Sequence, residues 1–151
     1  MANTKPFVQA ALICEQVLQE KDGVLTAVRI IDRITTEALP KNLPANLEPS
    51  VGFSVLVGLK SGNLRGTSRV AIKLRRPSGG ERDVSEFEIQ LNGEEHGANI
   101  LSTIRLAVKE FGVYWFDVYW NGGLLTSIPL RLVEGSAVAA PDTQSPANAR
   151  A

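Results

Sequence analysis

The chain has little cysteine and little histidine, and this scarcity excludes several kinds of site. Its 151 residues contain one cysteine, Cys14, and one histidine, His96. A lone cysteine excludes an internal disulfide and a cysteine-based zinc site, and it suits a reducing compartment. A zinc site would need several ligands beside His96, and a catalytic triad would need a nucleophile and an orienting acid, and the sequence shows neither pattern. We expect no metal and no cofactor.

Neither sign of charge is in excess. Sixteen Lys and Arg residues balance sixteen Asp and Glu residues, so the molecule as a whole has no field that would attract nucleic acid or an anionic membrane. The only basic cluster is the run Arg65, Arg69, Lys73, Arg75, Arg76. Alone it would suggest contacts to a phosphate backbone, but the acidic strand that follows makes cross-strand pairing the simpler explanation. We expect no nucleic-acid partner.

Long apolar runs are also missing. A helix that spans a bilayer needs roughly 20 apolar residues, and no run in the chain approaches that length. The stretch FVQAALIC, residues 7 to 14, ends in a cysteine like a lipoprotein signal. However, Gln9 interrupts it, and bulky Ile13 stands where signal cleavage requires a small residue. We expect a cytoplasmic protein that does not contact a membrane.

What the chain does contain is a series of segments with strand periodicity, beginning with a hairpin. Residues 7 to 18 and 24 to 36 are apolar and rich in β-branched residues, and Lys21-Asp22-Gly23 separates them as a turn. Cys14 falls on the inward face of the first strand and is expected to be a small core residue. The even-numbered apolar residues of the second strand are expected to point inward: Val24, Val28, Ile30 and Ile34.

Asp32 stands between Ile30 and Ile34, on the same inward face. A desolvated carboxylate there would have a raised pKa and could in principle act as an acid or base. Alternatively, the residue marks the end of the sheet, and its carboxylate accepts backbone N–H groups of the adjoining loop. We favour the second interpretation, and we expect Arg33 to be a surface cation.

The middle of the chain contains a long loop and further strands. Residues 37 to 50 carry three prolines and form a connection. A strand follows at 51 to 59, then a Gly/Ser/Asn turn region, and then two strands at 69 to 76 and 83 to 91 that form a second hairpin. Residues 100 to 108 favour a strand, although their apolar residues also fit one face of a helix.

The register of the second hairpin follows from aligning its apolar faces. Facing residue numbers should sum to 161, which places Leu74 opposite Phe87 and Ile72 opposite Ile89. The same register predicts two ion pairs on the outer face, Arg75 with Glu86 and Lys73 with Glu88.

The last hairpin consists of strands at 113 to 120 and 124 to 133 around Asn121-Gly122-Gly123. A two-residue loop would place Phe116 opposite polar Ser127. A three-residue loop instead places Phe116 opposite Ile128 and Tyr114 opposite Leu130, so we expect the longer loop.

About seven to eight short strands without a clear helix predict an all-β fold, an antiparallel β-sandwich formed by residues 1 to 134. Residues 135 to 151 are rich in Ala, Ser and Pro and lack large apolar groups, so we expect a flexible, disordered tail.

Two stretches resemble known families. The run Gly112-x-Tyr114-x-Phe116-x-Val118 resembles the sixth strand of immunoglobulin domains, which implies an immunoglobulin-like sandwich in which Tyr114 forms a tyrosine corner. Residues 6 to 34 and 112 to 132 resemble the two ends of a family of small, uncharacterised bacterial proteins, which implies a bacterial single-domain protein without known catalytic residues. One conflict is open: simple strand alternation puts the Asn121 turn at the same end as the Lys21 turn, and an immunoglobulin topology puts it at the opposite end.

The candidate binding surface is the outer face of the last hairpin. Trp115, Asp117 and Tyr119 alternate with the core positions, and Trp120 ends the strand. Aromatic rings beside a carboxylate can anchor a protein interface or bind a sugar ring. The alternative is that a neighbouring segment or a second subunit covers this face.

We expect a non-enzymatic module that binds another protein through this surface, with a homo-oligomer as one possible assembly. The first alternative is a carbohydrate-binding domain that uses Trp115, Tyr119 and Trp120. The second is a small hydrolase around Asp32 or His96, although the sequence contains no catalytic motif.

Overall fold

The computed structural model describes residues 5–37 and 49–135, and all of its regular elements are β-strands. The seven strands are β1 (Phe7–Gln19), β2 (Leu25–Ile30), β3 (Arg33–Glu37), β4 (Ser50–Arg75), β5 (Glu81–Ala107), β6 (Gly112–Trp120) and β7 (Gly123–Gly135). The predicted all-β class is confirmed, and residues 100 to 107 are strand rather than helix. Most of the predicted 37–50 loop and residues 136–151 of the predicted tail lie outside the described residues, whereas Gly135 belongs to β7.

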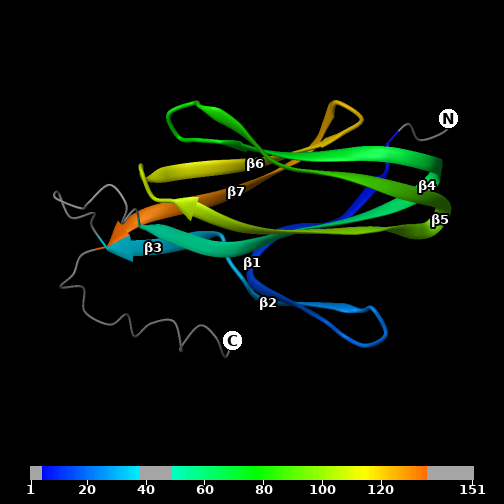
Figure 1. Ribbon diagram of the computed structural model, residues 1–151, viewed down its shortest axis with the longest axis horizontal. Coiled ribbons are helices and arrows are strands. Elements are labelled where there is room, and N and C mark those ends of the chain that lie inside the picture. Colours follow the sequence, from blue (N-terminus) through cyan, green and yellow to red (C-terminus); the bar gives the residue numbers. More distant parts are fainter. Residues whose placement is uncertain (1–4, 38–48, 136–151) are drawn as a thin grey trace, which may run out of the picture.

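A long antiparallel ribbon of β4 and β5 forms the frame of the fold. The two strands stay paired from Ser50↔Ala107 to Arg75↔Glu81, and the ribbon doubles back on itself at the right-hand end of Figure 1. The register shifts on both sides of Gly62, which adopts a positive φ of 61°. The predicted turn region after residue 59 is therefore a bulged corner within continuous strands, because irregular pairing bends a ribbon without ending it.

Because the ribbon doubles back, its two halves belong to two layers. The first half of β4 pairs with β1, and the second half pairs with β6, which in turn pairs with β7. β3 then joins the far edge of β7 in parallel. The Phe53 ring from one layer meets the Phe116 ring from the other edge-on, with centroids 5.6 Å apart. This two-layer arrangement is an immunoglobulin-like β-sandwich.

The second hairpin forms, but the predicted register is wrong. Val70, not Leu74, faces Phe87, and Arg75 faces Glu81. Hydrogen bonds from Arg76 N to Gly80 O and from Gly79 N to Arg76 O close a tight turn, so β5 begins at Glu81 instead of 83. A bulge between Ile72 and Lys73 adds a further offset. The apolar faces still align because the error is an even number of residues over most of the hairpin.

In the last hairpin the predicted faces are confirmed but the predicted loop length is wrong. Phe116 pairs with Ile128 and Tyr114 with Leu130. The loop itself is Asn121-Gly122, both residues with positive φ as two-residue hairpin turns require. A bulge between Val118 and Tyr119 restores the parity that the short loop would have reversed.

The first hairpin has the predicted turn, but its outer part leaves the sandwich (Figure 1). Val24 is 58% exposed and Ile30 is 65% exposed, so the prediction that they point inward is wrong. Arg29 takes a positive φ of 58°, which interrupts the alternation just before the chain passes to β3. Within residues 24 to 36, all of which the structure describes, only Ile31 and Ile34 pack against the core, and both follow this break.

The first and last hairpin turns point toward the same end of the molecule (Figure 1), as strand alternation predicts. The immunoglobulin-like layering is nevertheless present, because β2 leaves the sandwich and β3 crosses to the edge of β7. The expectation from an immunoglobulin strand order, that the two turns lie at opposite ends, is therefore wrong, although the layers pack as in an immunoglobulin-like sandwich.

Candidate functional site

β6 holds the candidate site, and its inward residues behave as predicted. Tyr114, Phe116 and Val118 are buried in the core. The Tyr114 hydroxyl donates a 2.6 Å hydrogen bond to the backbone carbonyl of Glu110, four residues earlier, and forms the tyrosine corner that the resemblance implies. Burial, and then the negative charge of Glu110, raise the pKa of Tyr114. Tyr114 is therefore a structural residue.

The outer face of β6 centres on Asp117, whose side chain is only 4% exposed. Arg75 of β4 holds both carboxylate oxygens, with Nε–Oδ2 and Nη2–Oδ1 distances of 3.0 and 3.1 Å. The Ser127 hydroxyl donates a third hydrogen bond at 2.7 Å. The Arg75 hydrogen bonds lower the pKa of Asp117 against the opposing effect of burial. Asp117 is thus satisfied internally and is not available to a partner, which corrects its place in the predicted surface.

Trp115 and Tyr119 flank Asp117 on the same outer face and are half-buried. The Arg75 guanidinium lies over the Trp115 ring, 5.4 Å from its centroid, and the Lys73 ammonium lies 5.2 Å from the centroid of the Tyr119 ring. Such cation–π contacts are attractive and reduce the open area of each ring. The predicted covering of this face therefore comes, in part, from cations of the neighbouring strand β4.

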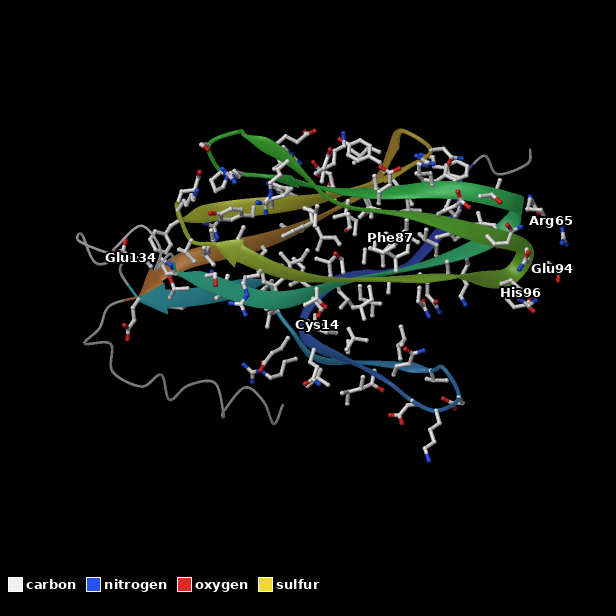
Figure 2. The ribbon with its side chains drawn as sticks, viewed as in Figure 1. Cys14, Arg65, Phe87, Glu94, His96 and Glu134 are labelled. Carbon is white, nitrogen blue, oxygen red and sulfur yellow. The ribbon has the colours of Figure 1, made fainter. Side chains whose placement is uncertain are left out.

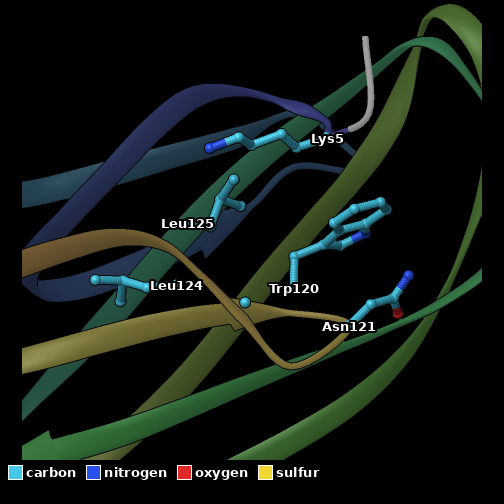
Figure 3. Close-up of a pocket in the computed structure, with 6 residues that line it drawn as sticks. Lys5, Trp120, Asn121, Leu124 and Leu125 are labelled. Carbon is cyan, nitrogen blue, oxygen red and sulfur yellow. The ribbon is translucent and has the colours of Figure 1, made fainter.

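Trp120 does not belong to this surface. It lies on the opposite face of β6 and packs against the core. Figure 3 shows it beside Leu125 and Lys5, which with Leu124 line a separate open groove of about 290 Å³. Its Nε1 is buried and has no hydrogen-bond partner among the described residues. The prediction that Trp120 adds to the Trp115 surface is wrong, because Trp120 continues the inward alternation of Phe116 and Val118 along β6.

The basic run on β4 is largely paired, although with other partners than predicted. Arg69 binds Glu86 at 2.7 Å. Lys73 lies 3.8 Å from Glu81 and 3.9 Å from Asp83. The predicted pairs of Arg75 with Glu86 and Lys73 with Glu88 are absent from the described residues, because the register differs. Cross-strand pairing of these cations with carboxylates is therefore observed, although the partners differ from those predicted. Such exposed pairs contribute little stability.

The remaining predicted candidates are dispersed. Asp32 is exposed rather than inward, and its backbone carbonyl accepts a hydrogen bond from Arg131 N at 2.9 Å. His96 is exposed at the β4–β5 corner, 3.8 Å from Glu95 (Figure 2). Cys14 is fully buried as predicted, and burial raises the pKa of its thiol. The structure brings neither His96 nor Cys14 together with another candidate, whereas Asp32 lines a groove beside Trp115.

A groove beside Trp115 contains two arginines that the sequence did not connect. It measures about 330 Å³ and is lined by Asp32, Arg33, Val113, Trp115, Pro129 and Arg131. Arg33 of β3 and Arg131 of β7 are direct neighbours in the parallel ladder. Only the pairing of β3 with β7, residues about a hundred positions apart, creates this site. A local sequence pattern carries no signal for such a pairing.

Two further observations concern metal binding and membrane spans. Within residues 5–37 and 49–135, no group of three or more His, Cys, Asp or Glu side chains could hold a metal ion. Over the same part of the chain, no helix is long and apolar enough to cross a membrane.

Several solved structures are similar to this chain. One is the CARDB domain of the PF1109 protein from Pyrococcus furiosus, crystallised with di-metal ions, at 10% identity and a TM-score of 0.41, covering 88% of this chain and 93% of that one. Another is an immunoglobulin-like protein, PA1606, from Pseudomonas aeruginosa, at 14% identity and a TM-score of 0.39, covering 87% and 99%. No curated protein matches the sequence.

A protein-family model also matches most of the sequence. Residues 9–133 match a family of unknown function, DUF6941. The matched range extends from β1 into β7 and includes every residue that lines the Trp115 groove. The chain belongs to this family.

Proposed function

We propose that the protein is a non-catalytic module that binds another protein through the outer face of β6 and β7. The observation that carries this proposal is Trp115, a half-buried indole at the edge of an open groove whose other lining includes exposed Pro129. Trp is the residue type most enriched among the few side chains that dominate protein interfaces. Arg75 supports the ring from one side, so the indole has little conformational freedom to lose on binding.

A carbohydrate site has less support from the same residues. A sugar ring stacks on an open aromatic face, but cations of β4 lie over Trp115 and Tyr119. Trp120 faces the core side and cannot extend the platform. Protein binding does not require an open ring face, because an indole edge and its surroundings can fill a complementary pocket.

The test is affinity capture from the native cell, with quantitative mass spectrometry of the recovered proteins. Wild-type protein is compared with Trp115→Ala and with Leu101→Ala, a control that removes an exposed apolar side chain from β5. We expect at least one protein whose recovery falls about tenfold with Trp115→Ala, as at an interface hot spot, and is unchanged with Leu101→Ala. Circular dichroism verifies that both variants are folded. If no recovered protein distinguishes Trp115→Ala from wild type, the proposal fails.

A further inference from the structure

The groove beside Trp115 contains an unbalanced pair of like charges. Arg33 and Arg131 are adjacent on β3 and β7, and both are exposed. Among the described residues, neither makes an ion pair or a side-chain hydrogen bond. Like charges directly opposite each other in a sheet are destabilising. Asp32 also lines the groove and supplies one negative charge against the two positive ones.

Three cations of β4 differ from this pair. Arg69, Lys73 and Arg75 on β4 each have a carboxylate partner. Arg33 and Arg131 differ from these three cations because they lie side by side without a carboxylate partner among the described residues. A bound anion would neutralise this pair.

The groove also has an apolar part. Trp115, Val113 and Pro129 line it beside the two arginines. A planar guanidinium binds a carboxylate through two parallel N–H···O bonds, and an indole beside a proline ring offers a surface for an apolar side chain. The site therefore combines a cationic subsite, which can bind an anion, with an apolar subsite in the same groove.

We propose that this groove binds an acidic peptide segment of the partner protein. A carboxylate side chain of that segment binds Arg33 and Arg131, and a neighbouring apolar side chain packs on Trp115 and Pro129. This inference rests on the proposed function, because Trp115 belongs to both. A nucleic acid fits less well, since Asp32 lines the groove and Glu134 and Glu37 are exposed further along the same two strands.

The experiment is selection of a random eight-residue peptide library displayed on phage against the immobilised full chain. A consensus peptide is then synthesised with a fluorophore, and its affinity is measured by fluorescence anisotropy for the wild type, Trp115→Ala, Arg131→Glu and Arg82→Glu. Arg82 is a matched control, because it is an exposed arginine without an ion pair on β5, separated from β7 by β4 and β6.

We expect the selected peptides to share Asp or Glu next to an aliphatic or aromatic residue. Arg131→Glu should weaken binding by about tenfold or more, as loss of a charge-assisted pair does, and Arg82→Glu should leave binding unchanged. Replacing the acidic residue of the peptide by its amide should weaken binding to wild type in the same way. Thermal melting verifies that each variant is folded.

The other outcomes separate this inference from the proposed function. Peptides that require Trp115 but lack acidic residues, or that bind Arg131→Glu as well as wild type, would overturn the acidic specificity and leave the protein-binding proposal standing. Competition by inorganic phosphate as strong as competition by the unlabelled peptide would show an anion site without peptide specificity, and would also overturn the inference. If no selected peptide depends on Trp115, both proposals fail.

Discussion

The first and last hairpins of this protein have similar sequence patterns and opposite structural roles. Both alternate apolar and polar residues around a short turn containing glycine. In the β6–β7 hairpin, Phe116 and Ile128 face each other within the sandwich. In the β1–β2 hairpin, Val24 and Ile30 are mostly exposed. Alternation therefore identifies which residues share a face, but it does not identify what covers that face.

The difference arises where each hairpin meets the rest of the fold. β1 is held by β4 only from Phe7 to Cys14, and beyond that point its partner is β2 alone. An ion pair between Arg29 and Glu15 joins these two strands near their base. An isolated two-stranded ribbon is marginally stable in water, so the outer part of this hairpin depends on its own cross-strand contacts. β6, in contrast, is paired on both sides, by β4 and β7.

The largest expected effect tests this contrast directly. Phe116→Ala should lower the free energy of unfolding by about 3 to 5 kcal/mol, because it leaves a cavity in a well-packed core. Ile30→Ala should change it by less than about 0.5 kcal/mol, because Ile30 is mostly exposed. Urea denaturation of both variants gives the two values. A cost for Ile30→Ala comparable with that for Phe116→Ala would show that the projecting hairpin is packed against something in solution, and the contrast would be lost.

A smaller effect concerns the outer face of β6. Asp117→Asn should destabilise the protein by about 1.5 to 3 kcal/mol at neutral pH, because a charged, hydrogen-bonded partner of Arg75 is replaced by a neutral one. The folded-state pKa of Asp117 lies below its ordinary value of 3.8. The stabilisation is therefore fully present above about pH 4 and is lost as the pH falls through the folded-state pKa.

The measurement is urea denaturation of wild type and Asp117→Asn at neutral pH and in a series below about pH 4. The difference between the two proteins should shrink as the pH falls. A difference that stays constant across the acidic range would mean that the loss comes from the amide NH2 group, which cannot accept a hydrogen bond from Arg75, and not from the charge of the carboxylate. The outer face of β6 would then lack the charge-dependent stabilisation that sets it apart from the projecting hairpin.

The smallest effect concerns the corner that precedes β6. Tyr114→Phe removes one hydroxyl and its hydrogen bond to the Glu110 carbonyl, and should cost about 0.5 to 1.5 kcal/mol while leaving the fold intact. Thermal melting measures the loss of stability, and circular dichroism verifies that the fold is intact. A neutral effect would show that the corner is held by Ser78, whose N–H and hydroxyl donate hydrogen bonds to the Glu110 carboxylate, rather than by Tyr114.

The sequence predicted one residue of the candidate site, Trp115, but not the residues that surround it. Trp115 was identified because alternation with Tyr114 and Phe116 places it on the outer face of its strand. The neighbours of Trp115 in space were not predicted. Arg75 of β4 binds Asp117, and Arg33 of β3 completes the groove beside Trp115. Period-two patterns report on a single strand, whereas a site depends on which strands pair and in what register.

Local alternation and short motifs were enough to predict the class of fold, the inward residues of β6 and β7, the tyrosine corner and the burial of Cys14. Three features depend on the packing of the whole chain: β4 and β5 are continuous through a bulged corner, the first hairpin leaves the sandwich, and Arg33 lies beside Arg131. They could not be predicted because bulges shift the register by one residue and long-range pairing joins distant segments. Neither event changes the local pattern of apolar and polar residues from which the strands were predicted.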